Sequence, residues 1–236
     1  MVEVELTSAG PVAIVTLNRP AKRNAISIAM QSELLAALER VAETADVRVL
    51  VLAGAGDDFC VGGDHAVVER MEAEAHFAQV AAAQHRQVFS LLLGFEMPVI
   101  AAIEGRAFGF GAELAAASDI VLVGETARLA DPHVPLGLPP APVTLLAWPL
   151  MTSRLIAAEL VLTGREVAAA EAVALGLASR MVPAGTALTE AMALAAALAA
   201  MPGGGMALAK RALRLAIADL DALYPEALGA NEKPRR

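Results

Sequence analysis

The sequence predicts an α/β core followed by a helical end. Apolar runs typical of buried strands alternate with helical runs early in the chain, whereas only helical patterns follow residue 151. The clearest strands are VRVLVLA at 47–53 and VIAAI at 99–103. This alternation is the pattern of an α/β fold.

The elements before residue 124 are predicted from apolar periodicity and from caps. A strand at 12–17 leads to a helix over 27–44 that Ser27 can cap. Four apolar residues of this helix fall on one face at helical spacing: Leu34, Leu35, Leu38 and Val41. After strand 47–53, the chain is expected to form a long helix over 69–93, the strand 99–103 behind Pro98, and a short strand at 120–123.

The second half is predicted to be helical. Glycines and prolines divide it into four segments: 151–162, 167–175, 187–200 and 204–218. With 236 residues, 57% of them apolar and only one Trp and one Tyr, the chain can bury a sizeable core. So few charges predict that part of the surface is buried against copies of the same chain.

Composition argues against several classes of protein. The start, MVEVELTS, lacks a signal-peptide core, and the apolar stretch 191–201 is too short to cross a bilayer. One cysteine excludes an internal disulfide framework, and a net charge of −8 argues against nucleic-acid binding. The four histidines lack metal-ligand spacing, and His76 and His85 are interpreted as solvated helix residues. A soluble cytoplasmic protein without a metal is expected.

Two glycine-rich turns carry the clearest functional signal. One follows the strand 47–53 and contains Cys60-Val61-Gly62-Gly63-Asp64; the other follows 99–103 and runs from Phe108 to Glu113. Glycines let backbone N–H groups approach a ligand closely, and a helix N-terminus adds aligned donors. If the turns face one another, they form an oxyanion hole of main-chain donors, which indicates chemistry on a carbonyl or thioester.

Four segments resemble one family. FCVGGD resembles the F-[SC]-A-G-A-D turn of the crotonase (enoyl-CoA hydratase/isomerase) superfamily, and EGRAFGFGAELAAASDIVL resembles its G-x-A-x-G-G-G-x-E-L-x-x-x-x-D-I segment. LNRPAKRNAIS and LTGREVAAAEAVALGLASRMVP resemble two further family segments. The four matches occur in family order and cover most of residues 12–185. The resemblance implies a ββα spiral core with an acyl-CoA site over 1–185, and a helical region over 186–236 that packs around a trimer axis.

The resemblance also implies roles at the turns. Gly63 and Phe110 match the two oxyanion donors, although the second position is usually glycine, so a benzyl group is expected beside the pocket. Glu113 matches one of two glutamates that handle a water in enoyl-CoA hydratases; an acid favoured by a helix N-terminus is the alternative. Coenzyme A would be part of the substrate, with no separate cofactor. A homotrimer or homohexamer is implied.

The second family glutamate is replaced here. In Asp131-Pro132-His133-Val134 the histidine stands at its position, and a hydratase-like subgroup of the family has a similar D-x-H-V stretch. His133 either replaces the glutamate as a proton carrier or only lines the pocket. Asp131 is a lesser candidate for a catalytic carboxylate. The loop that follows is glycine-rich in the family, whereas three prolines stiffen it here: Pro139, Pro140 and Pro142.

Other polar residues are weaker candidates. Arg19, Lys22 and Arg23 match a family loop that binds the CoA adenosine and phosphates, although a solvated charge cluster is nearly as consistent. The same resemblance gives substrate or CoA contacts to five further residues: Ala25, Gly62, Asp64, His65 and Gly109. A Cys60–His65 nucleophile pair is less favoured than a small buried thiol. One late helix carries three cations, and the sequence leaves open whether they reach CoA or stay in water: Lys210, Arg211 and Arg214.

The sequence thus predicts an enzyme that hydrates a 2-enoyl-CoA. The nearest alternative is a sister reaction on the same oxyanion hole, either double-bond isomerisation or decarboxylation, which needs less acid–base apparatus. A non-catalytic acyl-CoA binding protein is a third possibility, favoured by the missing glutamate and the proline loop. The stretch after Arg214 is shorter than in the family by about a helix, which leaves its part in the CoA site and the subunit contact open.

Overall fold

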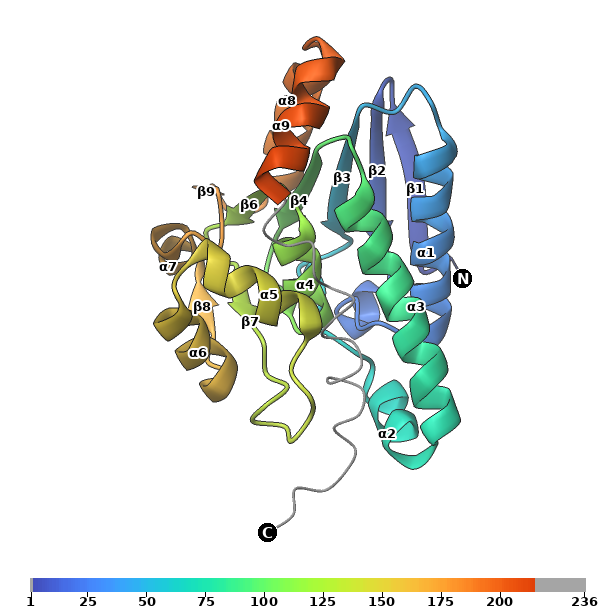
Figure 1. Ribbon diagram of the computed structural model, residues 1–236, viewed down its shortest axis with the longest axis vertical. Coiled ribbons are helices and arrows are strands. Elements are labelled where there is room, and N and C mark those ends of the chain that lie inside the picture. Colours follow the sequence, from blue (N-terminus) through green and yellow to red (C-terminus); the bar gives the residue numbers. More distant parts are fainter. Residues whose placement is uncertain (1, 215–236) are drawn as a thin grey trace.

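A computed structural model describes residues 2–214, with a large and a small β-sheet surrounded by helices (Figure 1). The large sheet has the strand order β1-β2-β3-β4-β6-β9, in which only the β1–β2 pair is antiparallel. Its strands are β1 (Val4–Ala9), β2 (Val12–Leu17), β3 (Val49–Gly54), β4 (Val99–Ile103), β6 (Ile120–Gly124) and β9 (Arg180–Val182).

A small second sheet extends the end of β4 toward the glycine turns. It has the order β5-β7-β8 and consists of β5 (Arg106–Phe108), β7 (Arg128–Ala130) and β8 (Val167–Ala168). Ala107 in β5 also bridges to Cys60 of the first glycine turn. The small sheet therefore connects the second turn to the first.

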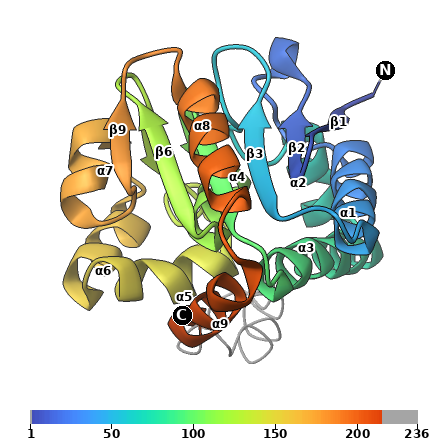
Figure 2. The same cartoon turned by 90° about the horizontal axis from the view of Figure 1, so that it is seen from above.

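Helices surround the two sheets. They are the 3₁₀ turn η1 (Pro20–Lys22), α1 (Ile28–Glu43), α2 (His65–Ala73), α3 (Ala75–Gly94), α4 (Phe110–Ala117), α5 (Pro142–Met151), α6 (Arg154–Thr163), α7 (Ala169–Leu175), α8 (Ala187–Ala199) and α9 (Gly203–Arg214). Figure 2 shows α8 lying across one face of the strands, while α1 and α3 lie on the other.

Helix α8 explains much of the alanine content. Four alanines spaced four residues apart are buried against the sheet: Ala187, Ala191, Ala195 and Ala199. They pack on strand residues that include Val49, Val51 and Ile100. Small side chains at this spacing let a helix approach a sheet closely. This first part of the predicted C-terminal region 186–236 therefore packs directly on the core; the domain division itself stays a prediction.

Several predicted elements match the structure. Strands 12–17 and 99–103 have the predicted bounds. Ser27 caps α1, since its hydroxyl accepts a hydrogen bond from the Met30 N–H at 2.9 Å. The predicted α/β fold class with C-terminal helices is confirmed.

Other predicted elements differ. The stretch 69–93 is two helices, α2 and α3, which are separated by the extended backbone of Glu74. Helix α5 is not predicted from the sequence, because its prolines suggest a loop; Pro142 instead occupies the first turn, where a missing N–H costs no helical hydrogen bond. Strand β1 and the short strands β5, β7, β8 and β9 are also missed.

Within residues 2–214 no single helix is long and apolar enough to cross a membrane; Ala187–Ala199 and Gly204–Leu213 meet the length and composition criterion only as a pair bent by 118°. The predicted end of helix 204–218 and the shortened C-terminus lie outside the described residues from 215 onward.

Candidate active site

The two glycine turns lie against each other. Gly62 and Gly109 both have positive φ, at 98° and 50°. A Cβ placed on Gly109 would lie 3.6 Å from the Gly62 Cα. The Phe108 N–H donates to the Cys60 carbonyl at 2.8 Å, which joins the turns by a backbone hydrogen bond. Only glycine combines this backbone conformation with such a close approach.

The two expected donors are available at this junction. Phe110 is the first residue of α4, so its N–H has no acceptor within the helix. Among residues 2–214, no acceptor takes a hydrogen bond from the Gly63 or Phe110 N–H. Both residues line the same pocket. They are the two residues that the resemblance assigns to the oxyanion donors.

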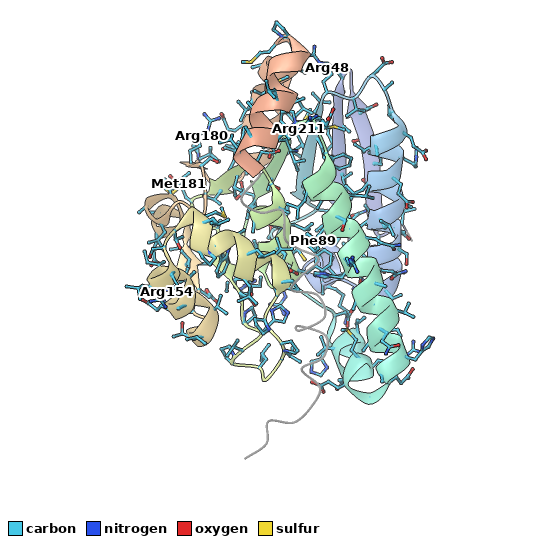
Figure 3. The ribbon with its side chains drawn as sticks, viewed as in Figure 1. Arg48, Phe89, Arg154, Arg180, Met181 and Arg211 are labelled. Atoms are coloured by element: carbon cyan, nitrogen blue, oxygen red, sulfur yellow. The ribbon has the colours of Figure 1, made fainter. Side chains whose placement is uncertain are left out.

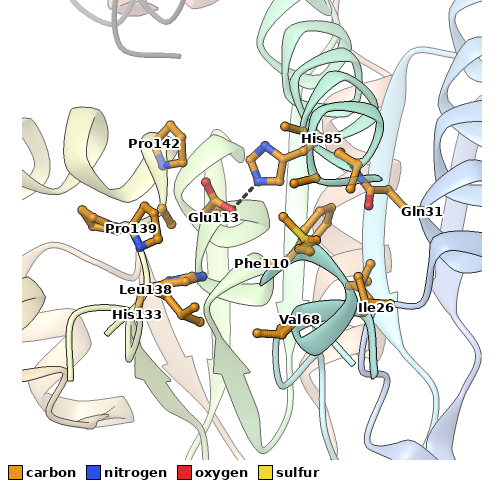
Figure 4. A pocket seen from close by; sticks show the side chains of 18 of the residues that line it. Ile26, Gln31, Val68, His85, Phe110, Glu113, His133, Leu138, Pro139 and Pro142 are labelled. Atoms are coloured by element: carbon orange, nitrogen blue, oxygen red, sulfur yellow. Dashed lines mark hydrogen bonds and ion pairs between the residues drawn. The ribbon is translucent and has the colours of Figure 1, made fainter. Parts of the chain in front are cut away.

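The pocket has a volume of about 240 Å³ and is mainly apolar (Figure 4). One wall comes from α2 and α3, through Val67, Val68, Met71, Ala78, Ala81 and Ala82. The opposite wall is the proline loop Leu138, Pro139, Pro140, Ala141 and Pro142. Four side chains that can carry a proton line the cavity: Glu72 on the α2 side, and His85, Glu113 and His133. The loop that the sequence marks as unusual is thus a wall of the pocket.

Glu113 is the buried carboxylate of the pocket. It lies on α4, and its side chain is only 2% exposed. Its Oε1 accepts from the Val143 N–H at 3.1 Å, and its Oε2 lies 2.7 Å from the His85 Nε2. Val143 lies in the first turn of α5, where backbone N–H groups need an outside acceptor. Two partners therefore fix the orientation of the Glu113 carboxylate.

The interpretation of His85 as a solvated residue is wrong. Its side chain is 19% exposed, lines the pocket and pairs with Glu113. Its ring also packs against Phe89 and Phe110, with centroid distances of 4.6 and 5.3 Å. The sequence contains a signal for this: His85 falls four residues after Ala81 and four before Phe89, on the buried stripe of α3. His76 on the same helix is exposed, as expected.

His133 is held by a buried carboxylate. Its Nδ1 hydrogen-bonds to the Asp131 carboxylate, whose other oxygen accepts from the Thr144 hydroxyl. Because Asp131 occupies Nδ1, the second ring nitrogen, Nε2, is the one left for the pocket. Asp131 thus faces His133 and Thr144, and its part is to orient the imidazole.

The pair also changes both pKa values. Burial would lower the pKa of His133, but the hydrogen bond and charge of Asp131, together with the charge of Glu113, raise it above its ordinary value. Burial would raise the pKa of Asp131, but the hydrogen bond and charge of His133 and the Thr144 hydroxyl lower it. Both shifts favour an imidazolium beside a carboxylate.

The residues expected at the CoA phosphates are not equivalent. Arg19 is tied into the fold: it forms ion pairs with Glu3 at 3.2 Å and Asp64 at 2.9 Å, and donates to the Ala25 carbonyl at 2.6 Å. Asp64 in turn accepts from the Ala66 N–H at the start of α2. Lys22 and Arg23, by contrast, are exposed. Their binding role stays a prediction.

Cys60 and His65 do not form a nucleophile pair. Cys60 is fully buried, and burial raises the pKa of its thiol to about 12, so the reactive thiolate is scarce at neutral pH. The His65 side chain is 87% exposed, lies 3.2 Å from Glu69 and lines no part of the pocket described above. Its predicted contact with the substrate stays a prediction.

Lys210 neither reaches the pocket nor stays in water. It is buried, and its Nζ lies 2.8 Å from an Asp119 carboxylate oxygen and 2.5 Å from the Met97 carbonyl. The expectation that Lys210 reaches CoA or stays in water is therefore wrong. These contacts of Lys210 anchor α9 to the core. Arg211 pairs with Glu96 at 2.6 Å on the surface. Over the described part of the chain, no three His, Cys, Asp or Glu side chains could together hold a metal ion.

Comparisons with known proteins identify the family of this chain. A family model described as enoyl-CoA hydratase/isomerase matches residues 7–227. The 2,3-dehydroadipyl-CoA hydratase of Escherichia coli is 33% identical over 203 residues, which cover 86% of this chain and 78% of that protein. Enoyl-CoA hydratase EchA19 of Mycobacterium tuberculosis is 36% identical over 183 residues, which cover 77% of this chain and 68% of that protein.

A solved structure extends the likeness to the fold. The crystal structure of an enoyl-CoA hydratase/isomerase from Mycobacterium paratuberculosis matches with a TM-score of 0.91 at 33% sequence identity, covering 98% of this chain and 92% of that chain. The family model covers both glycine turns, Glu113 and the helices behind them. The chain therefore belongs to the enoyl-CoA hydratase/isomerase family.

Proposed function

We propose that this protein adds water across the double bond of a 2-enoyl-CoA thioester. The observation that carries the proposal is the joint placement of Glu113, His133 and two available N–H groups on one apolar pocket. The apolar walls suit an acyl chain, and the paired donors suit a thioester oxygen. Two of the relatives named above are hydratases, which supports the same reaction.

In this proposal the thioester oxygen accepts hydrogen bonds from the Gly63 and Phe110 N–H groups. Glu113 takes a proton from water while the water oxygen bonds to the β-carbon. The electron pair of the double bond moves toward the carbonyl, and the two N–H groups stabilise the negative charge that develops on the oxygen. Fixed donors act without reorganising during the reaction.

His133 completes the addition. Its Nε2–H donates a proton to the α-carbon, which restores the thioester carbonyl and leaves the imidazole neutral. The raised pKa of His133 increases the share of the proton-donating form. The proton on Glu113 then returns to His133 through solvent, so water is added with no net change in the enzyme. A histidine thus supplies the proton where the family has a second glutamate.

The decisive experiment is mass spectrometry of 2-enoyl-CoA substrates incubated with the protein in H₂¹⁸O. A product heavier by one labelled water supports hydration. A product of unchanged mass with a moved double bond indicates isomerisation, and loss of CO₂ from a carboxylated substrate indicates decarboxylation. Binding without any product across a broad panel would leave only a non-catalytic binding protein.

We also propose that the working form is a trimer or a dimer of trimers. Three leucines on α5 and α6 are more than half exposed: Leu150, Leu155 and Leu162. Figure 3 shows Arg154, Arg180 and Met181 on the same flank of the molecule, beside α6, α7 and β9. Exposed apolar surface of this kind favours a subunit contact. A stable monomer in light scattering at micromolar concentration would contradict this assembly.

A further inference from the structure

His85 connects the two parts of the proposed catalytic apparatus. Its Nε2 lies 2.7 Å from Glu113 Oε2, as the dashed line in Figure 4 shows, and its ring packs edge-on against Phe110. Glu113 is the proposed base, and the N–H of Phe110 is one of the proposed oxyanion donors. A single side chain on α3 therefore contacts both residues of α4.

The His85 ring is confined by aromatic neighbours. Phe89 lies one helical turn further along α3, with its ring centroid 4.6 Å from that of His85. Phe89 and Phe110 also contact each other, with centroids 5.1 Å apart. Phe110 stands where the family usually has glycine, so its benzyl group supplies a packing surface for His85 that glycine would not. Such packing fixes the direction of Nε2.

The hydrogen bond has one chemically sensible direction. An ionised carboxylate only accepts hydrogen bonds, so the His85 Nε2 donates to Glu113 Oε2. The Val143 N–H donates to the other oxygen. Each oxygen keeps a further lone pair, through which Glu113 can face the water. Removing either donor would leave a buried carboxylate with fewer partners and more freedom to rotate.

We propose that His85 is a positioning residue that holds the Glu113 carboxylate in the orientation needed to take a proton from water. This inference rests on the hydratase proposal. In this role His85 acts through its contact with Glu113 rather than on the substrate itself. Its substitution should lower kcat with little change in KM, because the base is misaligned while the acyl pocket is kept.

Two substitutions separate the donor from the packing. His85→Phe keeps an aromatic ring between Phe89 and Phe110 but removes the N–H donor. His85→Gln loses the ring but can place an amide N–H near the position of Nε2. We expect kcat of His85→Phe to fall by about 10- to 100-fold, the range that a hydrogen bond to a charged group represents, and His85→Gln to recover much of it. His76→Phe on the same helix is the matched control and should be unchanged.

The reverse pattern would overturn the inference. Full activity in His85→Phe together with low activity in His85→Gln would mean that only ring packing matters. Melting temperatures establish whether each variant has folded. If both His85 variants are less stable than the parent, the comparison of their kcat values still distinguishes the N–H donor from ring packing.

A second readout does not depend on turnover. In ¹⁵N-histidine NMR of the whole protein, the signal absent from His85→Phe identifies His85, and its Nε2 should carry a proton. Glu113→Gln should shift that signal; an unchanged signal would contradict the pairing. A parent protein that is inactive on all enoyl-CoA substrates rejects the hydratase proposal and with it the catalytic role of His85. An active parent with fully active His85→Phe rejects the role of His85 alone.

Discussion

The His133 imidazole lies directly beside Gly109, so closely that a side chain on Gly109 would crowd the ring. A Cβ built on Gly109 would come within 3.1 Å of the His133 Cε1 and 3.7 Å of its Nε2. Gly109 immediately precedes Phe110, the second proposed oxyanion donor. The proposed proton donor is therefore packed directly against the turn proposed to bind the thioester oxygen, which is where the proposed mechanism needs a proton for the α-carbon.

Gly109→Ala should impair catalysis more than binding. The positive φ strains any side chain at this position, and the new methyl group would displace the His133 ring. We expect kcat to fall by at least about tenfold, because a positioned acid contributes about 10²–10⁴ in rate. Steady-state kinetics and calorimetric CoA affinity measure the two effects. Gly94→Ala, at a helical site with open space around the added methyl, is the control and should keep full activity.

Glu113→Gln tests the proposed base. The amide keeps the shape of the side chain but cannot take a proton, so hydration of crotonyl-CoA or a longer substrate should fall by about 10²-fold or more with little loss of affinity. His133→Ala should cause a comparable fall if the imidazole is the acid, and a mild one if it only lines the pocket. Glu96→Gln, on an exposed ion pair, is the matched control. Unchanged turnover in Glu113→Gln would exclude this carboxylate as the base.

The sequence predicts the local features of the site well, because glycine turns and helix caps depend on a few adjacent residues. The two glycine turns themselves and the cap at Ser27 are predicted in this way, whereas the contact between Gly62 and Gly109 is only a condition that the structure fulfils. The long-range pairs are harder. His85 and Glu113 are 28 positions apart, and their contact depends on how α3 lies beside α4. Helical periodicity marks His85 as buried but does not name its partner.

Two errors have different physical causes. The break between α2 and α3 falls at Glu74, where neither glycine nor proline marks it, so a continuous helix is the natural expectation. At Pro142 the residue type is informative but ambiguous, because proline both stiffens loops and begins helices. That ambiguity conceals α5, whose first turn supplies the Val143 N–H to Glu113.

Asp131→Asn tests how the acid is kept protonated. The pKa of His133 is raised despite burial because of Asp131 and Glu113, so removing the Asp131 charge should lower it. Since the imidazolium is the active form in the proposed mechanism, kcat should fall as pH rises through that pKa, and the fall should begin at lower pH in the variant. Activity below the transition should be largely kept. A pH–kcat profile whose alkaline limb does not move would contradict the role of Asp131.

The same pair predicts the pH dependence of stability. The raised pKa of His133 gives stability that is complete below its unfolded value near 6.5 and is lost as pH rises through the folded pKa. The lowered pKa of Asp131 gives stability that is present above about 3.8 and is lost as pH falls through its folded pKa. The free energy of unfolding can be measured by urea denaturation at several pH values. In Asp131→Asn it should decrease less than in the parent, both at high pH and at low pH.

The loop cations can now be tested separately. Lys22 and Arg23 are exposed, whereas Arg19 forms ion pairs with Glu3 and Asp64. If the loop holds the CoA phosphates, Lys22→Ala with Arg23→Ala should weaken CoA binding and flatten its salt dependence while leaving the melting temperature unchanged. Arg19→Ala should instead lower the melting temperature, because Asp64 loses its partner beside the oxyanion turn.

Calorimetry at two salt concentrations and thermal unfolding separate these outcomes. Arg154→Ala removes an exposed cation on α6, far along the chain from the loop, and is the control for a general loss of positive charge (Figure 3). Equal affinity in the Lys22/Arg23 double variant and the parent would move the phosphate site away from this loop. Weakened binding in Arg154→Ala as well would mean that CoA responds to the net charge of the protein rather than to a local site.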